Sequence, residues 1–404
     1  MSAMAAGGNH ASVASSASTV IAVAPQIPSD DEELYAAIGT AGRRPRTSAA
    51  PADSASASSG SMPGSTSGRS TGQNDSDVSD SSNGASTQIL FQADIVKHSA
   101  SMSSSVRAHV YEGGLRYHAF RDGKYPFPND EIEQNRDDMK HSMSIMVCHG
   151  AYFLAPVEDR LRAGGEVLDL GTGTGIWAIE LGDKYPDTKI IGIDLSPIQP
   201  DFVPENVHFF VDDFEEDWVE PQHKYDYIHV RHTLHCIRDR KALYRRAMRH
   251  LKPGGYLEFQ ELEYWPRCDD DTLTPETPYA VRDYIKYMEA GMRAYGAELH
   301  AVRSLAAELR EAGFEDVRST THKAPIGLWP LDRRLRICGA LLQTAFLDGL
   351  RGLSRRPLTA LGWTQLQIEM FLVDVRKALS NQTIHAYLPF HDVYARKPMS
   401  CPSD

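Results

Sequence analysis

Short apolar runs alternate with segments of helical character through the middle of the chain. The runs are EVLDLG (166–171), KIIGIDL (189–195), VHFFVDD (207–213), YDYIHVR (225–231) and GYLEFQEL (255–262). Their length and their content of Val, Ile and aromatic residues predict strands, with helices between the first few of them. Strands that alternate with helices predict a doubly wound, mostly parallel α/β sheet.

The pattern continues on both sides of these runs. A long helix is expected to begin at Asn129 or Asp130, because either side chain can cap it and acidic residues follow in its first turn. A helix and a sixth strand are expected within 304–327, a helical block over about 331–380, and a last strand within 383–397. The sheet then has seven strands, in a domain that spans 106–398 with its core at 160–263.

Residues 1–105 are dominated by Ser, Ala and Gly and contain few large apolar residues. Burial there cannot offset the entropy of ordering, so we expect this tail to be disordered. Within it, SDDEELYAAIG (29–39) can form one short helix with Ser29 as its cap. The tail is either a partner-binding or phosphorylatable segment or a solvated leader. The cluster GRRPR (42–46) is either a weak nuclear import signal or a chance basic cluster.

A glycine loop follows the first strand of the predicted sheet. Gly171, Gly173 and Gly175 are spaced G-x-G-x-G, whereas dinucleotide-binding loops have the spacing G-x-G-x-x-G. Glycines let the backbone approach a ligand, and the helix that follows offers free N–H donors. Asp169 stands just before the loop, where a carboxylate repels phosphate but attracts the amino group of a methionine moiety. The loop, with Thr172, is therefore predicted to bind S-adenosylmethionine rather than NAD.

Two further acidic positions end the second and third strands. Asp194, which is followed by Leu195, can accept hydrogen bonds from both ribose hydroxyls of the cofactor. Asp213 or its neighbour Asp212 can accept from the exocyclic amine of adenine. The alternative is that these acids only cap the helices that follow. Acids at three successive strand ends form a specific constellation, and we expect them to surround one cofactor.

The end of the fourth strand carries the candidates for chemistry. Methyl transfer from a sulfonium needs mainly positioning, and it needs a base only when the acceptor arrives protonated. His232 is the first candidate for a base, and His229 and Arg231 are candidates for orienting substrate or cofactor. The alternative is that all three line the loop without chemistry. A metal site at His229, His232 and His235 is disfavoured, because strand-to-helix geometry would spread the rings and no carboxylate or cysteine supports it.

Composition and charge narrow the function further. The net charge of −12 argues against sequence-independent nucleic-acid binding, which needs clustered Lys and Arg. The five cysteines form no C-x-x-C pair, so neither a zinc site nor a disulfide framework is predicted, and a reducing compartment fits best. No apolar run approaches the roughly 20 residues of a membrane helix.

Several stretches resemble one family. VLDLGTGTGIWAIELGDKYP (167–186), GIDLSPIQP (192–200) and VPENVHFFVDDFEEDW (203–218) resemble the class I S-adenosylmethionine-dependent methyltransferases, and specifically the fungal LaeA-like group. The flanking stretches RYHAFRDGKYPFPNDEIEQNR (116–136), EYWPRCDDDTL (263–273) and IHAYLPFHDVYARKP (384–398) agree. The resemblance covers about 110–398. It implies a lid over the cofactor that includes Tyr117, His118, Asp130, Glu131 and Arg136; the alternative is a helix packed on the sheet, with Arg136 in a surface ion pair.

The resemblance also implies a role. It implies a nuclear, and also cytoplasmic, regulator of fungal secondary metabolism and development that works with velvet-family proteins. The resemblance does not imply one methyl acceptor; a protein, with the chain itself among the options, is a candidate. The alternative is a pathway enzyme that methylates a small natural product, which an apolar pocket built from 264–380 would favour. A third hypothesis is a scaffold that binds the cofactor only for stability.

Overall fold

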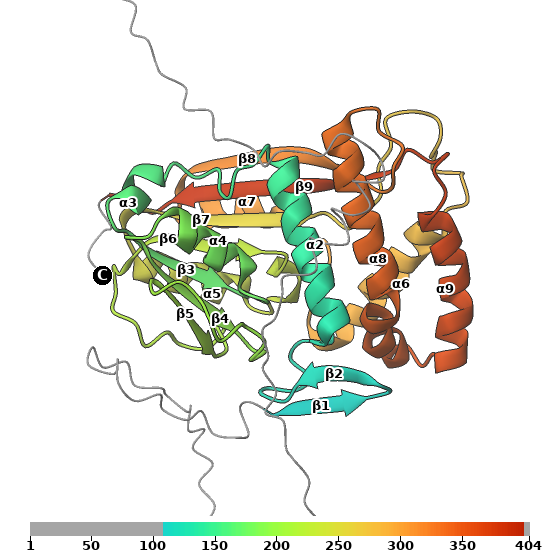
Figure 1. The fold of residues 1–404 in the computed structure, drawn as a ribbon, viewed down its shortest axis with the longest axis horizontal. Coiled ribbons are helices and arrows are strands. Elements are labelled where there is room, and N and C mark those ends of the chain that lie inside the picture. Colours follow the sequence, from blue (N-terminus) through green and yellow to red (C-terminus); the bar gives the residue numbers. More distant parts are fainter. Residues whose placement is uncertain (1–107, 400–404) are drawn as a thin grey trace, which may run out of the picture.

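The computed structural model describes residues 108–399 of the chain. A seven-stranded sheet with the order β5-β4-β3-β6-β7-β9-β8 runs through it (Figure 1). Its strands are β3 (Glu166–Leu170), β4 (Lys189–Asp194), β5 (Val207–Val211), β6 (Tyr225–Arg231), β7 (Leu251–Leu262), β8 (Glu315–Pro325) and β9 (Tyr387–Arg396). The strands from β3 to β7 are parallel, and β9 is antiparallel to both of its neighbours, β7 and β8. The predicted fold class is confirmed.

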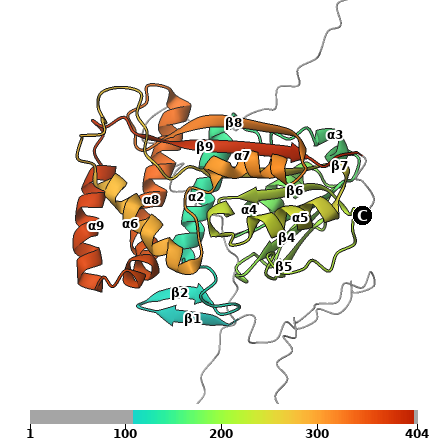
Figure 2. The same ribbon diagram turned by 180° about the vertical axis from the view of Figure 1, so that it is seen from behind.

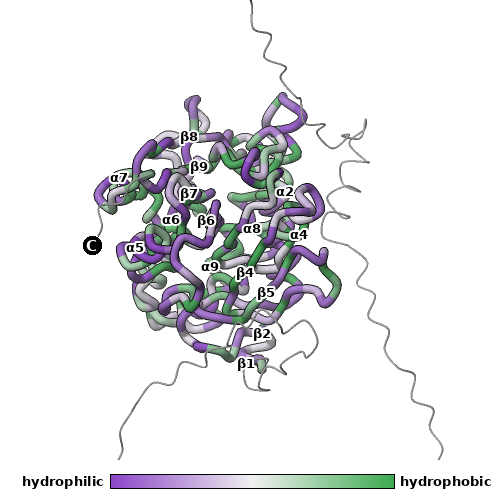
Figure 3. The backbone as a smooth tube through the Cα atoms, turned by 90° about the vertical axis from the view of Figure 1, so that its left-hand side faces the viewer, coloured by the Kyte–Doolittle hydropathy of each residue, from purple (hydrophilic) through white to green (hydrophobic). Residues whose placement is uncertain are grey.

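Helices cover both faces of the sheet, because successive residues of a strand point to opposite sides. Val167 packs in a cluster with α3 and α4, whereas Leu168 packs in a cluster with α5 and α7. The covering helices are α3 (Glu158–Arg162), α4 (Ile176–Lys184), α5 (Arg240–His250) and α7 (Val302–Glu311). Figure 2 gives the opposite view, and Figure 3 shows that α5 is largely hydrophilic. Burial on both faces explains why the central strands are continuous apolar runs.

Parallel pairing brings the carboxyl ends of β3, β4, β5 and β6 to one edge of the sheet. Asp169 lies opposite Gly192 of β4 and opposite His229 of β6. Asp194 lies opposite Val211, the last residue of β5. The polar residues predicted for a site at these strand ends are therefore neighbours in space.

A helical layer lies beyond this edge of the sheet. It consists of α2 (Glu131–Val147), α6 (Ala280–Met292), α8 (Arg333–Ala360) and α9 (Gln365–Leu379). Helix α2 lies between the sheet and α8 and packs against α8 (Figure 1). Of the two predicted caps, Asp130 is the one used, since it accepts the N–H of Glu133 at 3.1 Å. Asn129 instead donates its amide to Ser196 at 3.2 Å.

A β-hairpin precedes α2 and was not predicted from the sequence. Its strands are β1 (His109–Glu112) and β2 (Leu115–His118). The expectations for 1–105, including the short helix at 29–39 and the basic cluster at 42–46, lie outside the described residues. Between 108 and 399, none of the helices is both long and apolar enough to cross a bilayer.

Candidate active site

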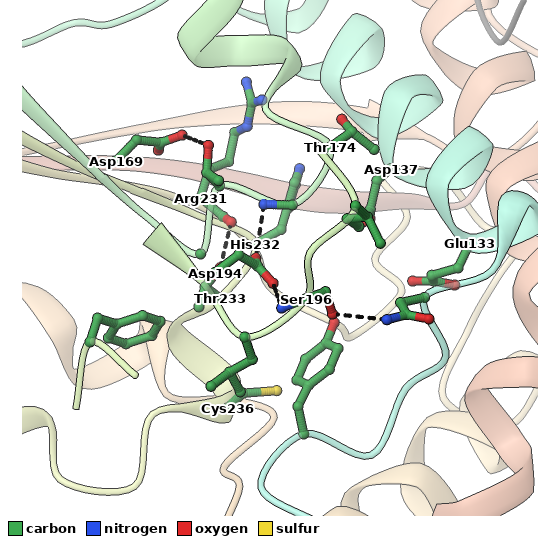
Figure 4. Close-up of a pocket in the computed structure, with 18 of the residues that line it drawn as sticks. Glu133, Asp137, Asp169, Thr174, Asp194, Ser196, Arg231, His232, Thr233 and Cys236 are labelled. Atoms are coloured by element: carbon green, nitrogen blue, oxygen red, sulfur yellow. Dashed lines mark hydrogen bonds between the residues drawn. The ribbon is translucent and has the colours of Figure 1, made fainter. Parts of the chain in front are cut away.

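A pocket lies at the carboxyl ends of β3 to β6, between the sheet and α2 (Figure 4). We call it the strand-end pocket. Residues of the predicted site that line it are Asp169, Gly171, Thr172, Gly173, Asp194, Leu195, Asp213, His229, Arg231 and His232. Gly175 and Asp212 are not among its lining residues. The sequence thus placed most of the candidates around one pocket, although they come from four strands.

The glycine loop is shaped by close neighbours on one side and open space on the other. Gly175 has φ 79°, and a Cβ there would lie 2.4 Å from the Phe209 ring. Gly173 has φ 57°, but the nearest atom to a Cβ there is Asp137 Oδ2 at 3.6 Å. Gly175 is therefore required by the packing of the loop on the sheet, whereas Gly173 presents open backbone to the pocket.

Asp194 ends β4 and anchors the loop. Its carboxylate accepts the N–H of Gly173 at 2.9 Å and the N–H of Ser196 at 2.8 Å. Burial raises the pKa of Asp194 above its usual range, and the two N–H donors oppose that shift. Each carboxylate oxygen keeps a second acceptor position, so Asp194 can also receive hydroxyl groups from a ligand.

The structure distinguishes the two candidates after β5. Asp213 is 4% exposed and lines the pocket, whereas Asp212 is exposed and accepts the N–H of Asp213 at 2.7 Å. Asp213 accepts the N–H of Glu215 at 3.0 Å and forms an ion pair with Lys124. Lys124 also pairs with Glu215 at 3.1 Å. The acid expected to receive adenine is therefore held by a lysine in this structure.

Asp169 and His229 form a buried unit below the loop. Asp169 accepts the Thr172 hydroxyl at 2.6 Å and the His229 Nδ1–H at 2.7 Å. The His229 ring stacks on Trp177 with centroids 3.7 Å apart and planes 8° apart, and it is 1% exposed. Both oxygens of Asp169 are thus engaged by the protein. These contacts fit a role for His229 in fixing the loop better than a role in chemistry.

Arg231 reaches the pocket as a partly buried cation. Its Nη2 lies 2.8 Å from His141 Nδ1, and His141 Nε2 lies 2.8 Å from Glu180. Burial lowers the pKa of His141 to about 4, so the ring is neutral, accepting from Arg231 and donating to Glu180. Nη1 of Arg231 is buried and has no hydrogen-bond partner among the described residues. A buried donor of this kind calls for an acceptor, such as a ligand carboxylate.

His232 has one ring nitrogen bound and one free. The Ser144 hydroxyl donates to the Lys140 carbonyl at 2.8 Å, so at 3.1 Å it accepts from His232 Nε2–H. Nδ1 is then the unprotonated nitrogen, and it has no partner within 108–399. Burial, reinforced by Lys140 and Arg231, holds the pKa of His232 well below its usual value. The imidazole is therefore a neutral acceptor at pH 7.

The lid differs in detail from the expectation. His118 is buried, and its ring nitrogens contact the carbonyls of Phe120 (2.6 Å) and Tyr125 (3.3 Å). It therefore fixes the segment 119–130, which covers the pocket through Lys124 and Tyr125. The surface ion pair of Arg136, given as the alternative to a lid, is wrong, because Arg136 pairs with Glu133 in the interior.

The remaining expected lid residues have structural contacts. Tyr117 lies under Arg356, whose guanidinium carbon is 3.7 Å from the ring centroid. Asp130 caps α2, and Glu131 pairs with Arg116 at 2.8 Å. The pocket residues missed from the sequence include Lys124, Asp137 and Lys140. A signal was present for Asp137 and Lys140. They are three residues apart on one helix, a spacing that favours an ion pair, and the structure shows this pair at 2.9 Å.

A second pocket, which we call the apolar chamber, adjoins the first. It shares Tyr125, Lys140 and His232 with the strand-end pocket. Its other lining residues are Phe127, Arg136, His235, Leu262, Tyr264, Tyr284, Ile285, Met288, Leu299, Leu342, Ala345, Phe346 and Leu353. Most of these lie within 264–380, the range in which an apolar pocket would favour a small-molecule acceptor.

The strand-end pocket fits S-adenosylmethionine by its donors and acceptors. Arg231 Nη1, which has no partner between residues 108 and 399, matches the carboxylate of the methionine moiety. Asp194 offers acceptor positions beside the open backbone of Gly173, where the ribose is expected. No group of three metal-ligating side chains is found between 108 and 399.

Comparison with known proteins gives consistent matches. The family described as Methyltransferase domain matches residues 146–319. Methyltransferase pytC of Aspergillus terreus is 40% identical over 304 residues, which are 74% of this chain and 91% of that protein. Secondary metabolism regulator LAE1 of Cochliobolus heterostrophus is 36% identical over 72% of this chain and 95% of its own. Protein-methionine methyltransferase laeA of Emericella nidulans is 34% identical over 71% and 76%.

Proposed function

The chain belongs to the LaeA-like S-adenosylmethionine-dependent methyltransferases, and from that premise we propose how its strand-end pocket holds the cofactor. The single observation that carries the proposal is the pairing of Asp194 with the Gly173 N–H, which joins an acceptor to an open loop. When bound, S-adenosylmethionine supplies a methyl group activated by the sulfonium. The chain itself supplies orientation and exclusion of water.

Each wall of the pocket has a proposed task. Asp194 accepts the ribose hydroxyls, and Arg231 Nη1 donates to the methionine carboxylate. Asp213 accepts the adenine amine once Lys124 has moved away from it. His229 and Asp169 fix the loop, and His232 faces the reacting groups as a neutral acceptor.

Binding of S-adenosylhomocysteine, measured by titration calorimetry, tests these assignments. Asp194→Asn should weaken binding by about 1.5–3 kcal/mol, or roughly 10- to 150-fold in Kd, because a charge-assisted hydrogen bond is lost. Asp201→Asn is the matched control, since Asp201 is exposed on the loop after β4. Equal affinity of the Asp194 variant and the control would remove Asp194 from the site.

For the biological role, we propose a regulator of secondary metabolism and development. The names of the LAE1 and laeA relatives support this role. We further propose that the protein acts in the nucleus, and also occurs in the cytoplasm, with velvet-family partners; a protein is the first of two candidate methyl acceptors. Replacing the native protein in cells by the Gly173→Leu variant should then change the levels of many metabolites at once. The tagged native protein should be nuclear, and velvet-family proteins should co-purify with it.

A second candidate is methylation of a small natural product. The apolar chamber favours it, because its walls suit a small ligand, and the relative with 40% identity is named simply as a methyltransferase. Labelled S-adenosylmethionine added to an extract of producing cells separates the two. Label in protein that disappears with Gly173→Leu supports the regulator, whereas label in the low-mass fraction supports the biosynthetic enzyme.

A further inference from the structure

We propose that the apolar chamber binds the methyl acceptor, and that this acceptor is an uncharged, mostly apolar small molecule with one reacting hydroxyl group. The inference rests on the methyl-transfer function above and deepens its second candidate. The chamber adjoins the strand-end pocket through three shared residues, Tyr125, Lys140 and His232. A ligand there would lie beside the cofactor without displacing it.

The walls of the chamber select an apolar ligand. Helix α6 contributes Ile285 and Met288, and α8 contributes Leu342, Ala345 and Phe346. Each of these side chains is less than a tenth exposed. A charged ligand would lose its hydration against such walls without a partner to replace it, whereas an apolar ligand gains from burial.

The two cations at the chamber do not alter this selection. Arg136 pairs with Glu133, its Nε lying 2.8 Å from Oε2, and Lys140 pairs with Asp137 at 2.9 Å. Their charges are therefore balanced within α2. An anionic acceptor would have to compete with carboxylates already in place, and a cationic one would meet two cations.

Two histidines of the chamber have a ring nitrogen without a partner among the described residues, and one of them, His232, lies at the junction with the strand-end pocket. His232 has an unpartnered, unprotonated Nδ1, and His235 has an Nδ1 without a partner among the described residues. The His235 ring packs edge-on against Tyr264, with centroids 5.6 Å apart. Neutral imidazoles next to apolar walls match a ligand that is apolar at one end and carries a hydroxyl at the other.

The transfer step balances with the groups that are present. The acceptor oxygen forms a bond to the methyl carbon while the bond from that carbon to sulfur breaks, and the sulfonium becomes a neutral thioether. The hydroxyl proton passes to Nδ1 of His232 and then to water. No further reagent is required, because the positive charge of the sulfonium leaves as that proton.

A polypeptide acceptor fits the chamber less well. A peptide main chain brings N–H and C=O groups that need partners when buried. The wall residues from α6 and α8 are mainly hydrocarbon and largely closed to solvent. A small molecule with few polar atoms avoids this cost.

Binding of the uncharged dye N-phenyl-1-naphthylamine to the full chain, at saturating S-adenosylhomocysteine, tests the chamber. Met288→Trp and, from the opposite helix, Ala345→Phe fill it and should weaken dye affinity at least about tenfold. Leu366→Trp is the control, since Leu366 is 70% exposed on α9. Equal dye affinity in all three folded variants would overturn the proposal.

Competition against the dye tests the ligand class. In the wild type, 1-naphthol should displace the dye at least about tenfold better than 1-naphthoate or naphthalene, and His232→Phe should remove its advantage over naphthalene. Equal competition by the naphthoate contradicts an uncharged ligand. In an extract, Met288→Trp should abolish label in the low-mass fraction, and label confined to protein would overturn the acceptor assignment. Failure of the wild type to bind S-adenosylhomocysteine would instead refute the proposed function.

Discussion

Lys124, from the segment that precedes α2, forms an ion pair with Asp213, the buried acid that follows β5. The two residues are 89 positions apart in sequence, and their contact closes the segment 119–130 over the strand-end pocket. If Asp213 receives adenine, this pair must open each time the cofactor enters.

Replacing Lys124 by Met should therefore destabilise the free protein and strengthen its response to cofactor. The buried carboxylate loses its partner, at a cost of about 1–3 kcal/mol, and the adenine amine then supplies the missing donor. The measurement is thermal unfolding with and without saturating S-adenosylhomocysteine. Lys189→Met is the control, because Lys189 is exposed and 3.9 Å from Glu166. A cofactor-induced shift no larger than that of the control contradicts the prediction.

Leucine substitutions at two glycines of one loop should have different effects. Gly173→Leu should abolish S-adenosylhomocysteine binding with a loss of only about 1–2 kcal/mol in stability, because its side chain enters open space from a left-handed backbone. Gly175→Leu should prevent folding, since its Cβ would meet the Phe209 ring at 2.4 Å. Calorimetry and circular dichroism separate the two, and a folded Gly175 variant that only loses binding would be inconsistent with this packing.

Phenylalanine substitutions at His229 and His232 should distinguish a structural role from a catalytic one. His229→Phe keeps a ring on Trp177 but removes one of the two donors to Asp169, so we expect about 1–3 kcal/mol lower stability and nearly unchanged turnover. His232→Phe should lower turnover by about 10²- to 10⁴-fold at unchanged cofactor affinity. Labelled-methyl transfer at saturating cofactor, well below the melting temperature, is the readout. The reverse pattern would make His229 the catalytic histidine.

Glu261 should make stability depend on pH. It accepts the N–H groups of Thr233 and Leu234, both at 2.9 Å, and burial raises its pKa to about 7. The folded state then keeps a proton that the unfolded state has already lost above its ordinary pKa. The contribution to stability is present at low pH and is lost as pH rises from about 4.5 to 7, by about 3 kcal/mol.

The test compares the free energy of unfolding at pH 5 and pH 8 for the wild type and Glu261→Gln. Glutamine keeps an oxygen for the two N–H groups but does not titrate, so the variant should lose this part of the pH dependence. Parallel stability curves for the two proteins would show that Glu261 is already ionised at low pH.

Much of the fold follows from local patterns in the sequence. Burial on both faces of β3 and β6 makes those strands recognisable in the sequence as apolar runs, and the parallel pairing of β3 to β6 then fixes where the strand ends meet. On that basis alone, the sequence predicts that Asp169, Asp194 and His229 are neighbours. The choice of Asp213 over Asp212 could not be made, because a change of one position after a strand end alters which side chain turns inward.

Contacts between distant segments were beyond reach from the sequence. The ion pair of Lys124 with Asp213 and the chamber between α6 and α8 depend on tertiary packing, which leaves no periodic signal. Burial likewise decides the proton on His232 and the pKa of Glu261. These properties arise only when the whole chain has folded.

The position of β9 affects how the chain can fold during synthesis. β9, at the end of the described chain, sits between β7 and β8 and pairs with both. About 125 residues separate the end of β7 from the start of β9. At the rate of translation, the edge of β7 therefore stays unpaired for roughly 6 to 25 seconds. Until β9 has been made, the nascent chain exposes an unpaired sheet edge that a chaperone would have to cover. An mRNA truncated before β9 would yield an aggregation-prone fragment rather than a weakened enzyme.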